Sequence, residues 1–550
     1  MSCIVAMLLA LFAAADAPLT VWAVDPLVNV FQDALPQRRT EALAEVAQGE
    51  HASLQVVVRS DAAIAGLRAE APPLALEGGS ATLEPRAPRY VGYVPIEKET
   101  TSPASDQLRK PPAWFPDPLL EEESLDVAAG NAQPVWITVR VPVDAAPGVY
   151  RGSLRLSGTV DGAEAAATFP LAIRVYPVTV ENTRLWVSNW FSITSRGLDI
   201  DAKPGTEEYE ALFRRYARNM ADHRQNVAIV SVLGHTDITP REDGTLAFDF
   251  SRFDEEVRLL IEEGVIGRIE GGHIGHRSGR WTSHFVVRIC QVKDGKVVGS
   301  SVDAKSPAAD AFYSQFMPAL VAHLKERGWL EYYMQHVADE PIIPNADSYR
   351  AIADLVHKYA PEIRTMDASH AASLTGAIDI WVPQIDYLHK DFIHYQARQR
   401  AGDEVWMYTC VTPQGEYANR FIELPLMKTR LLHWVNFRSG TTGYLHWGYN
   451  KWRGDPFKDM TPPFWARDHL PAGDAWIVYP GKDGPLDSIR FEAMRDGIVD
   501  HELLCMLAGH DLAGAHELAA RHILDFDRYN TDVERFRATR RRLLEQLSEL

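Results

Sequence analysis

Hydrophobic and polar positions alternate with a period of two over the first third of the chain. Runs such as "ASLQVVVRS" (52–60), "PVWITVRVPV" (134–143) and "ATFPLAIRVYPV" (167–178) are separated by proline and glycine turns. Alternation bounded by turn residues is typical of antiparallel strands, and several such strands in series predict a β-sandwich. The proline-rich segment 103–124 predicts a long loop. We therefore expect a β-sandwich domain over residues 18–182.

From residue 183 onward, apolar strands alternate with longer amphipathic helices. Eight segments have the pattern of strands, namely Leu185–Ile193, Asn226–Leu233, Gly267–Ile274, Glu331–Ala338, Ile363–Ala368, Ile378–Ile385, Glu404–Cys410 and Gly443–Asn450. Helical spacing fills most of the gaps, for example over residues 207–223, 311–328 and 347–360. Eight β-then-α units predict a (β/α)8 TIM-type barrel over residues 183–550, with helices of the C-terminal segment closing its exterior.

One segment breaks this rhythm. Residues 285–302 carry "KDGK" between two β-rich halves, which predicts a hairpin. We expect this hairpin to lie within an excursion over residues 265–305, on the loop after the third barrel strand.

Composition narrows the possible functions. The chain has 550 residues, of which 46% are hydrophobic, so it has material for more than one domain. Its 74 acidic and 56 basic side chains give a formal charge of -18, which repels phosphate backbones and disfavours nucleic-acid binding. Nothing in the sequence indicates an oligomeric state.

The N-terminus has the pattern of an export signal. An apolar run over residues 4–15 is followed by small residues, with Ala15 and Ala17 fitting a cleavage site. This predicts a signal peptide over residues 1–17 and an exported protein, periplasmic or secreted. A buried N-terminal strand or helix is the alternative. No other stretch is long and apolar enough for a stable membrane span.

The cysteine and histidine spacings predict neither a disulfide framework nor a metal site. Cys290, Cys410 and Cys505 are scattered, without a C-x-x-C pair. His235 with Asp237, or His273 with His276, offers ligand types, but no spacing matches a known ligand set. We expect no metal and no cofactor.

The stretch "YYMQHVADEPIIP" (Tyr332–Pro344) ends a strand-like run with two adjacent carboxylates, Asp339 and Glu340. Reactive groups of a barrel lie at the carboxyl ends of its strands, which is where this pair falls. Pro341 biases Glu340 away from helical backbone angles, which predicts an extended chain past the strand end. The alternative to a catalytic role is that Asp339, at the rim of the barrel, caps the following turn and that Glu340 beside it is exposed to solvent.

Consecutive carboxylates suit one mechanism of glycoside hydrolysis. Neighbours in sequence rarely flank a scissile bond from opposite sides, as an acid and a nucleophile must. In a substrate-assisted route the 2-acetamido oxygen of the sugar attacks the anomeric carbon instead. Asp339 would then orient the acetamide N–H, while Glu340 would protonate the leaving oxygen.

Other predicted strand ends carry aromatic and hydrogen-bonding side chains. Sugars stack their apolar faces on aromatic rings and need polar partners for their hydroxyls, so a site with both suits a carbohydrate. Core packing is the alternative for any one of the tryptophans. The candidate substrate-binding residues are Trp190, His235, Gln384, Asp386, Tyr408, Trp447 and Asn450.

Long segments of the chain resemble the family 123 glycoside hydrolases, which include β-N-acetylgalactosaminidases. The likeness is carried by "VWITVRVPVDAAPGVYRGSLRL" (135–156), "HVADEP" (336–341), "VWMYTCVTPQGEYANRFIELPLMKTRLLHWVNFRSGTTGYLHWGYNKW" (405–452) and "DAWIVYPGKDGPLDSIRFEAMRDGIVDHELL" (474–504). The resemblance implies a β-sandwich followed by a (β/α)8 barrel, and retaining hydrolysis through an oxazoline-type intermediate. It places the Asp-Glu pair on Asp339 and Glu340, and implies that Tyr408 hydrogen-bonds the acetamide carbonyl.

The sequence thus predicts an exo-acting enzyme that releases terminal β-linked N-acetylgalactosamine from a glycan or glycolipid. A hexosaminidase that prefers N-acetylglucosamine is the alternative within the enzyme class. A non-catalytic carbohydrate-binding protein on the same fold is a second alternative. A third is that the N-terminal sandwich is itself a glycan-binding module, although we expect it to be a structural support.

Overall fold

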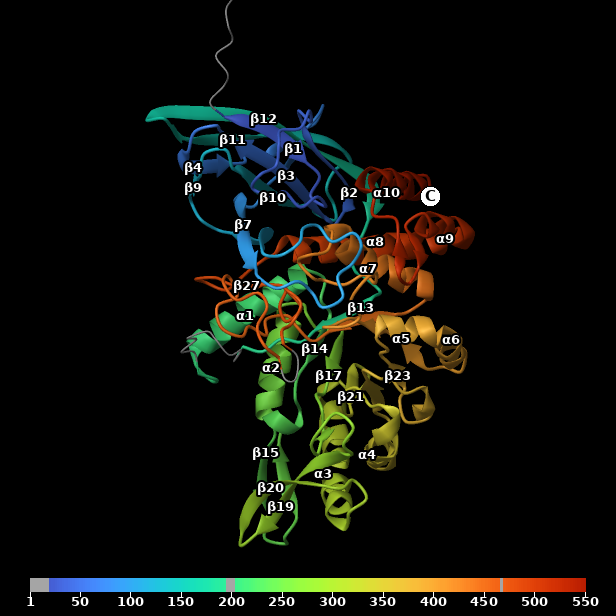
Figure 1. The fold of residues 1–550 in the computed structure, drawn as a ribbon. Coiled ribbons are helices and arrows are strands. Elements are labelled where there is room, and N and C mark those ends of the chain that lie inside the picture. The colour runs from blue at the N-terminus through green and yellow to red at the C-terminus, as the bar shows by residue number, and fades with distance from the viewer. Residues whose placement is uncertain (1–18, 194–202, 465–467) are drawn as a thin grey trace, which may run out of the picture.

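The computed structural model describes residues 19–193, 203–464 and 468–550. The predicted signal peptide, residues 1–17, lies outside the described residues. None of the described helices is long and apolar enough to cross a membrane. Figure 1 shows the β-rich N-terminal part at one end of the molecule and the barrel at the other, with α7 and α8 between them.

The N-terminal part consists of two sheets. The first has the order β1 (Thr20–Val24), β3 (His51–Arg59), β10 (Ala132–Arg140), β7 (Arg89–Ile96) and β8 (Ala113–Leu120). The second has the order β2 (Ala42–Gln48), β12 (Ala163–Thr179), β11 (Gly148–Val160), β4 (Ile64–Glu70) and β9 (Leu125–Val127), with β5 (Leu74–Leu76) and β6 (Thr82–Leu83) at its side. Both sheets contribute to one apolar core, for example through Val56 and Ile137 from the first and Leu154 and Ile173 from the second. Alternating side chains therefore meet between the sheets, as the period of two predicts.

The expected long loop over residues 103–124 is wrong in part. Residues Ala113–Leu120 form β8, which pairs antiparallel with β7 in spite of Pro116 and Pro118. Proline cannot donate a hydrogen bond to a sheet, and it is tolerated here because β8 is the edge strand.

The C-terminal part is built on nine parallel strands. Their order is β24 (Glu404–Val405), β23 (Ile380–Trp381), β22 (Arg364–Asp367), β21 (Tyr333–His336), β17 (Arg268–Glu270), β14 (Val227–Ile229), β13 (Trp186–Asn189), β26 (Gly443–His446) and β25 (Met407–Tyr408). The two ends of this path, β24 and β25, are separated in the chain only by Trp406, so the sheet is nearly closed into a barrel. Every one of the eight predicted strand segments contains a strand of this barrel.

Helices follow most of these strands. They are α1 (Glu207–Asp222), α2 (Ser251–Glu262), α3 (Pro307–Arg327), α4 (Ala346–Tyr359), α5 (Ile385–Lys390), α6 (Phe392–Arg400), α7 (Leu426–Ser439), α8 (Ile489–Ala508), α9 (Leu512–Ala520) and α10 (Val533–Ser548), with 3-10 turns η1 (Leu233–His235), η2 (Ile343–Asn345) and η3 (Ala372–Leu374). Between β22 and β23, where all residues are described, the chain forms η3 and no α-helix. The predicted alternation of eight strands with eight helices is therefore met in part.

Local signals in the sequence set the helix ends. The Ser306 hydroxyl caps α3 by accepting from the Ala309 N–H at 3.2 Å, and Pro307 occupies the first helical position. Gly328 ends the helix in the left-handed conformation, with φ of 72°.

The C-terminal part also contains small antiparallel pairs of strands outside the barrel sheet. They are β15 (Asp237–Pro240) with β16 (Leu246–Asp249), β27 (Tyr479–Pro480) with β28 (Pro485–Leu486), and β29 (Ile523–Asp525) with β30 (Arg528–Tyr529). The predicted hairpin is present as β19 (Phe285–Lys293) and β20 (Lys296–Val302), preceded by β18 (Gly275–Arg277), on the loop after the third barrel strand of the chain, β17. Figure 1 shows β19 and β20 extending away from the barrel beside α3.

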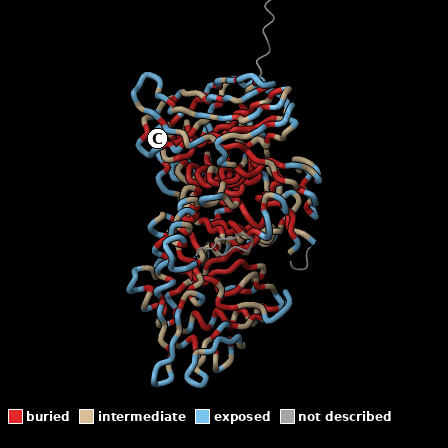
Figure 2. The backbone as a smooth tube through the Cα atoms, turned by 90° about the vertical axis from the view of Figure 1, so that its left-hand side faces the viewer, coloured by how far each residue is buried: buried red, intermediate tan, exposed pale blue. Residues whose placement is uncertain are grey.

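Helix α8 is buried along nearly its whole length, and its charged side chains are paired across to other elements. The tube in Figure 2 is red through this middle layer. The Arg490 guanidinium binds both carboxylate oxygens of Asp117 on β8 at 2.8 Å. Glu492 accepts from Arg89 on β7 at 2.6 Å, and Arg495 lies 2.7 Å from its second oxygen. These ion pairs join the β-rich part to the barrel.

Removing one member of this network is expected to destabilise the protein, because an ion pair broken inside the protein leaves a buried charge uncompensated. Arg89→Met removes the partner that Asp487 and Glu492 share. We expect a loss of about 3–5 kcal/mol of unfolding free energy, measured by chemical denaturation. The control is Arg151→Met, whose guanidinium pairs with Glu41 and Glu77 at the exposed surface. Equal denaturation midpoints for the two variants would contradict the prediction.

Candidate functional site

Asp339 and Glu340 lie just beyond the carboxyl end of β21, as the sequence predicts. Side chains at this position face the end of a parallel barrel where reactive groups gather. The Asp339 side chain is 49% exposed and the Glu340 side chain 19%. Both carboxyl groups are thus within reach of a ligand from solvent, and Glu340 is the more enclosed of the two.

Glu340 has an unusual backbone conformation. Its φ of 48° lies in the left-handed region, which is costly for a residue with a side chain, so the extended conformation predicted from Pro341 is wrong at this residue. Arg277 of β18 holds this conformation, because its Nη2 donates to the Glu340 carbonyl oxygen at 2.7 Å. The same guanidinium places Nη1 4.0 Å from Oδ2 of Asp339. Backbone strain that the surrounding structure maintains is typical of functional sites.

The carboxyl group of Glu340 is bound by Tyr408, the last residue of β25. The Tyr408 hydroxyl donates to Oε1 of Glu340, and Nε2 of His370 lies 2.5 Å from the same hydroxyl. Burial, and then the charge of Arg277, lower the pKa of His370 to about 4, so its imidazole is neutral at pH 7. With its proton on Nε2, His370 donates to Tyr408, which leaves the phenolic proton for Glu340. The Tyr387 ring stacks on His370 at 4.1 Å and fixes its orientation.

Both carboxyl groups of the pair hold protons more tightly than in water. Burial, and then the charge of Asp339, raise the pKa of Glu340 to about 8. The Asp339 side chain is half exposed, but the protein around its carboxylate desolvates that group. This desolvation, and then the charge of Asp367, raise the pKa of Asp339, while the charges of His336 and Arg277 oppose the rise. Two neighbouring acids titrate as a pair, and the protein raises the pKa of both, that of Glu340 to about 8.

A buried charge network lies directly beside the pair. His336, the last residue of β21, places Nδ1 2.6 Å from Oε1 of Glu270 and Nε2 3.5 Å from Oδ1 of Asp367, and all three side chains are fully buried. Burial alone would lower the pKa of His336, but Asp367 and Glu270 raise it to about 10, so the imidazole is charged at neutral pH. Asp367 also accepts from the Ala338 N–H at 2.8 Å, which fixes the residue before Asp339.

Two further predicted residues lie next to these groups. Trp190 donates through Nε1 to Glu270 at 3.1 Å, and its ring meets the ring of His336 edge-on at 5.5 Å. Gln384 pairs with the backbone of Tyr408 in an isolated parallel bridge, and its amide donates to Thr412 Oγ1 at 3.0 Å. Both thus help to build the walls of the site.

His235 and Asn450, two of the predicted substrate-binding residues, each have a partner within the protein. Nε2 of His235 lies 3.2 Å from Oε1 of Glu256 on α2, so its imidazole is directed at a helix outside the barrel. Asn450 accepts from the Ser192 N–H at 3.1 Å and donates to the Ser192 carbonyl at 2.9 Å, so its amide ties two loops together.

Trp447 and Asp386 lie at the edge of the site. Trp447 donates through Nε1 to Asp474 at 3.2 Å, and Asp386 is in the first turn of α5, where burial raises its pKa. Among the described residues, neither side chain forms a hydrogen bond or an ion pair with Asp339 or Glu340.

Sequence reasoning missed five residues that shape the site, namely Arg277, His370, Tyr387, Glu270 and Asp367. Glu270 and Asp367 are the last residues of β17 and β22. The rule that selected Asp339 therefore also applied to them, and an acid at the end of three successive strands was the available signal. Arg277 lies in the excursion after β17, and no spacing in the sequence connects it to β21.

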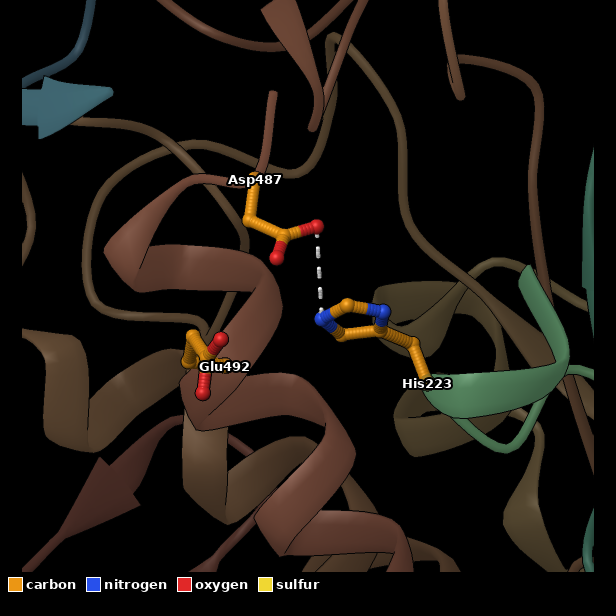
Figure 3. Close-up of side chains that lie close together, drawn as sticks. All are labelled: His223, Asp487 and Glu492. Carbon is orange, nitrogen blue, oxygen red and sulfur yellow. Dashed lines mark ion pairs between the residues drawn. The ribbon is translucent and has the colours of Figure 1, made fainter. Parts of the chain in front are cut away.

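Among the described residues, one group of side chains has metal-ligand spacing: His223, Asp487 and Glu492, drawn in Figure 3. Nε2 of His223 lies 3.7 Å from Asp487. His223 caps the end of α1 that leads into β14, so the group lies at the opposite end of the barrel strands from the acidic pair. Arg89 and Arg495 already neutralise the two carboxylates. A divalent cation would add unbalanced charge, so we assign this group to the ion-pair network.

The raised pKa of His336 makes stability depend on pH. A folded-state pKa near 10, against about 6.5 when unfolded, contributes stability that is complete below pH 6.5 and is lost as the pH rises toward 10. In His336→Gln we therefore expect a flatter decline of melting temperature between pH 6.5 and 10 than in the wild type. His276→Gln is the control, because burial lowers the pKa of that imidazole. The same decline in His336→Gln and the wild type would refute the prediction.

Solved structures provide a likeness over almost the whole chain. A family 123 glycoside hydrolase from Clostridium perfringens, whose structure was used to analyse glycolipid glycan hydrolysis, matches with a TM-score of 0.72 at 17% identity, covering 97% of each chain. At this identity the match shows a shared fold. A GH10 xylanase from termite gut (TM-score 0.33, 11% identity, 66% of this chain and 90% of that one) and β-glucuronidase 3 from Bacteroides uniformis (TM-score 0.30, 10% identity, 83% and 51%) are too distant to carry any argument.

Family models match both parts of the chain. The model of the glycoside hydrolase 123 N-terminal domain matches residues 32–158, and the model of the glycoside hydrolase 123 catalytic domain matches residues 179–507. No functionally curated protein matches the sequence. The catalytic model covers more than half of the chain and contains the acidic pair with its neighbours. The chain belongs to glycoside hydrolase family 123.

Proposed function

We propose that this glycoside hydrolase is exo-acting and releases terminal β-linked N-acetylgalactosamine by a retaining, substrate-assisted mechanism. The observation that carries the proposal is the consecutive pair Asp339 and Glu340 just beyond the end of β21, with Tyr408 bound to the Glu340 carboxyl. Two adjacent groups on one strand end can serve the acetamide and the leaving oxygen of a single sugar. They are poorly placed to act from opposite faces of the ring.

In the first step, the acetamide carbonyl oxygen of the substrate attacks the anomeric carbon and the bond to the leaving oxygen breaks. Glu340 gives its proton to that oxygen, while Asp339, as the carboxylate, accepts a hydrogen bond from the acetamide N–H and offsets the positive charge of the oxazolinium ion. In the second step, Glu340 takes a proton from water, whose oxygen attacks the anomeric carbon while the bond between that carbon and the acetamide oxygen breaks, which regenerates the acetamide. Two inversions give net retention.

Tyr408 supports this assignment. Its hydroxyl lies against Glu340 and is itself bound by His370. In the complex with substrate, Tyr408 turns its proton to the acetamide carbonyl oxygen and holds it near the anomeric carbon. Gln384 and Trp190 complete the polar and aromatic surroundings of the sugar, and Trp447 and Asp386 flank it.

The substrate that this proposal names is a glycan or glycolipid with terminal N-acetylgalactosamine. The Clostridium perfringens relative was analysed for its hydrolysis of glycolipid glycans, which supports the same substrate class here. The proposal also retains a division into a β-sandwich over residues 18–182 and a variant (β/α)8 barrel over residues 183–550, and export through the signal over residues 1–17.

The roles of the pair are tested with p-nitrophenyl 2-acetamido-2-deoxy-β-galactoside and its gluco epimer. We expect Asp339→Asn and Glu340→Gln to lower kcat by roughly 10²–10⁴-fold, with a smaller loss for Glu340→Gln because p-nitrophenol leaves with little protonation. Glu122→Gln, an exposed carboxyl in a loop, is the control. Near wild-type turnover in both site variants would refute the assignment, and faster release from the gluco epimer would change the proposed sugar to N-acetylglucosamine.

The participation of the acetamide is tested by fluorinating it, since fluorine withdraws electrons from the carbonyl oxygen. We expect kcat to fall steadily from the acetamido to the difluoro- and trifluoroacetamido substrate. A rate that does not respond to fluorination would exclude the substrate as nucleophile.

The pH dependence follows from the two acids. Activity is expected to fall above pH 8, because Glu340 loses the proton that it must donate. Activity is also expected to fall in acid, where Asp339 becomes protonated, and this fall begins at a higher pH than for an ordinary Asp because the pKa of Asp339 is raised. The kcat/KM profile is therefore bell-shaped, and in Glu340→Gln its alkaline limb should disappear. A flat profile from pH 4 to pH 9 would contradict this prediction.

A further inference from the structure

Trp281 is an exposed aromatic residue close to the acidic pair. It lies in the turn between β18 and β19, on the excursion after β17, and its side chain is 48% exposed. An exposed indole next to a catalytic site offers an apolar face that a sugar ring can cover.

The ring of Trp281 is held in place from one side. The Arg277 guanidinium lies over it, 3.9 Å from the ring centroid, and Nε of Arg277 donates to the Trp281 carbonyl oxygen at 2.9 Å. Asn345, at the end of η2, donates to the same carbonyl at 3.2 Å. One face of the indole is thus covered and its backbone is fixed, while the remaining surface stays open.

Arg277 connects this ring directly to the pair. Its Nη2 donates to the Glu340 carbonyl at 2.7 Å, and its Nη1 lies 4.0 Å from Asp339. One guanidinium therefore links the indole to the Asp339 carboxylate and to the backbone of Glu340. The group that binds the Glu340 carboxyl on the inner side, Tyr408, is only 3% exposed. Of the two aromatic residues near the pair, Trp281 is thus open to solvent and Tyr408 is enclosed.

We propose that Trp281 is the stacking platform for the first sugar ring of the leaving group. This inference rests on the proposed function. In an exo-acting enzyme the terminal sugar lies among the enclosed groups, while the rest of the glycan points toward solvent past the acid that protonates it. A pyranose ring offers an apolar C–H face that matches an open indole face. Because the indole is already immobilised, binding costs little side-chain entropy.

The test compares two substrates whose leaving groups need the same protonation but differ in a ring. One is a disaccharide in which the terminal acetamido sugar is β-linked to galactose, and the other is the methyl β-glycoside of the same acetamido sugar. In both substrates, the acetamido sugar is the epimer, galacto or gluco, that the wild type releases faster from the p-nitrophenyl glycosides. For Trp281→Ala we expect kcat/KM to fall about tenfold on the disaccharide, mainly through KM, and to stay within about twofold on the methyl glycoside.

Two variants serve as controls. Trp281→Phe keeps an aromatic face and should recover most of the disaccharide activity. Trp114→Ala removes a tryptophan that is 55% exposed on β8, in the other part of the molecule, and should affect neither substrate. Unchanged melting temperatures confirm that the variants are folded.

The outcomes distinguish a failure of the Trp281 platform from a failure of the proposed function. If the wild type cleaves both substrates and Trp281→Ala loses equal activity on both, Trp281 acts only by positioning Arg277 and the platform is refuted. Unchanged activity on both also refutes it. If the wild type cleaves neither substrate, the proposed function fails, and the platform fails with it.

Discussion

The bidentate pair between Arg490 of α8 and Asp117 of β8, together with the pair between Arg89 of β7 and Glu492, puts four charges between the sheets and the barrel. Although burial alone would raise it, Arg495 and Arg89 hold the pKa of Glu492 well below its ordinary value. Such charges are stable inside a protein only while every partner is present. The sheets therefore cannot leave the barrel without exposing carboxylates and guanidiniums that are matched only to each other. The N-terminal part is therefore fixed against the barrel by these ion pairs.

Charge is also what organises the end of the barrel. Glu270, His336 and Asp367 close three neighbouring strands with a buried imidazolium between two carboxylates, and the resulting field reaches Asp339. Arg277 acts on the same pair from the excursion on the other side. The two acids thus differ in proton affinity although they are neighbours in sequence, because each is enclosed to a different extent and faces different charges.

The parts that the sequence predicts are those governed by local pattern. Each of the eight apolar segments contains a barrel strand because β-strands and helices have different periods, and Asp339 and Glu340 are identified because strand ends are recognisable. Arg277 and His370 could not be found this way. Both reach the pair from loops whose course depends on tertiary packing. Asn450, a polar residue near a strand end, binds the Ser192 backbone, and no pattern in the sequence indicates that partner.

The left-handed backbone of Glu340 has a consequence for how this sequence can change over time. A glycine at this position would relieve roughly 1–2 kcal/mol of conformational cost and would still offer its carbonyl to Arg277, but it would remove the proton donor. Folding and chemistry therefore favour different residues at one position. In a descendant no longer selected for turnover, position 340 should be among the first to drift toward glycine or asparagine, while its neighbour in the chain, Asp339, is under no such pressure.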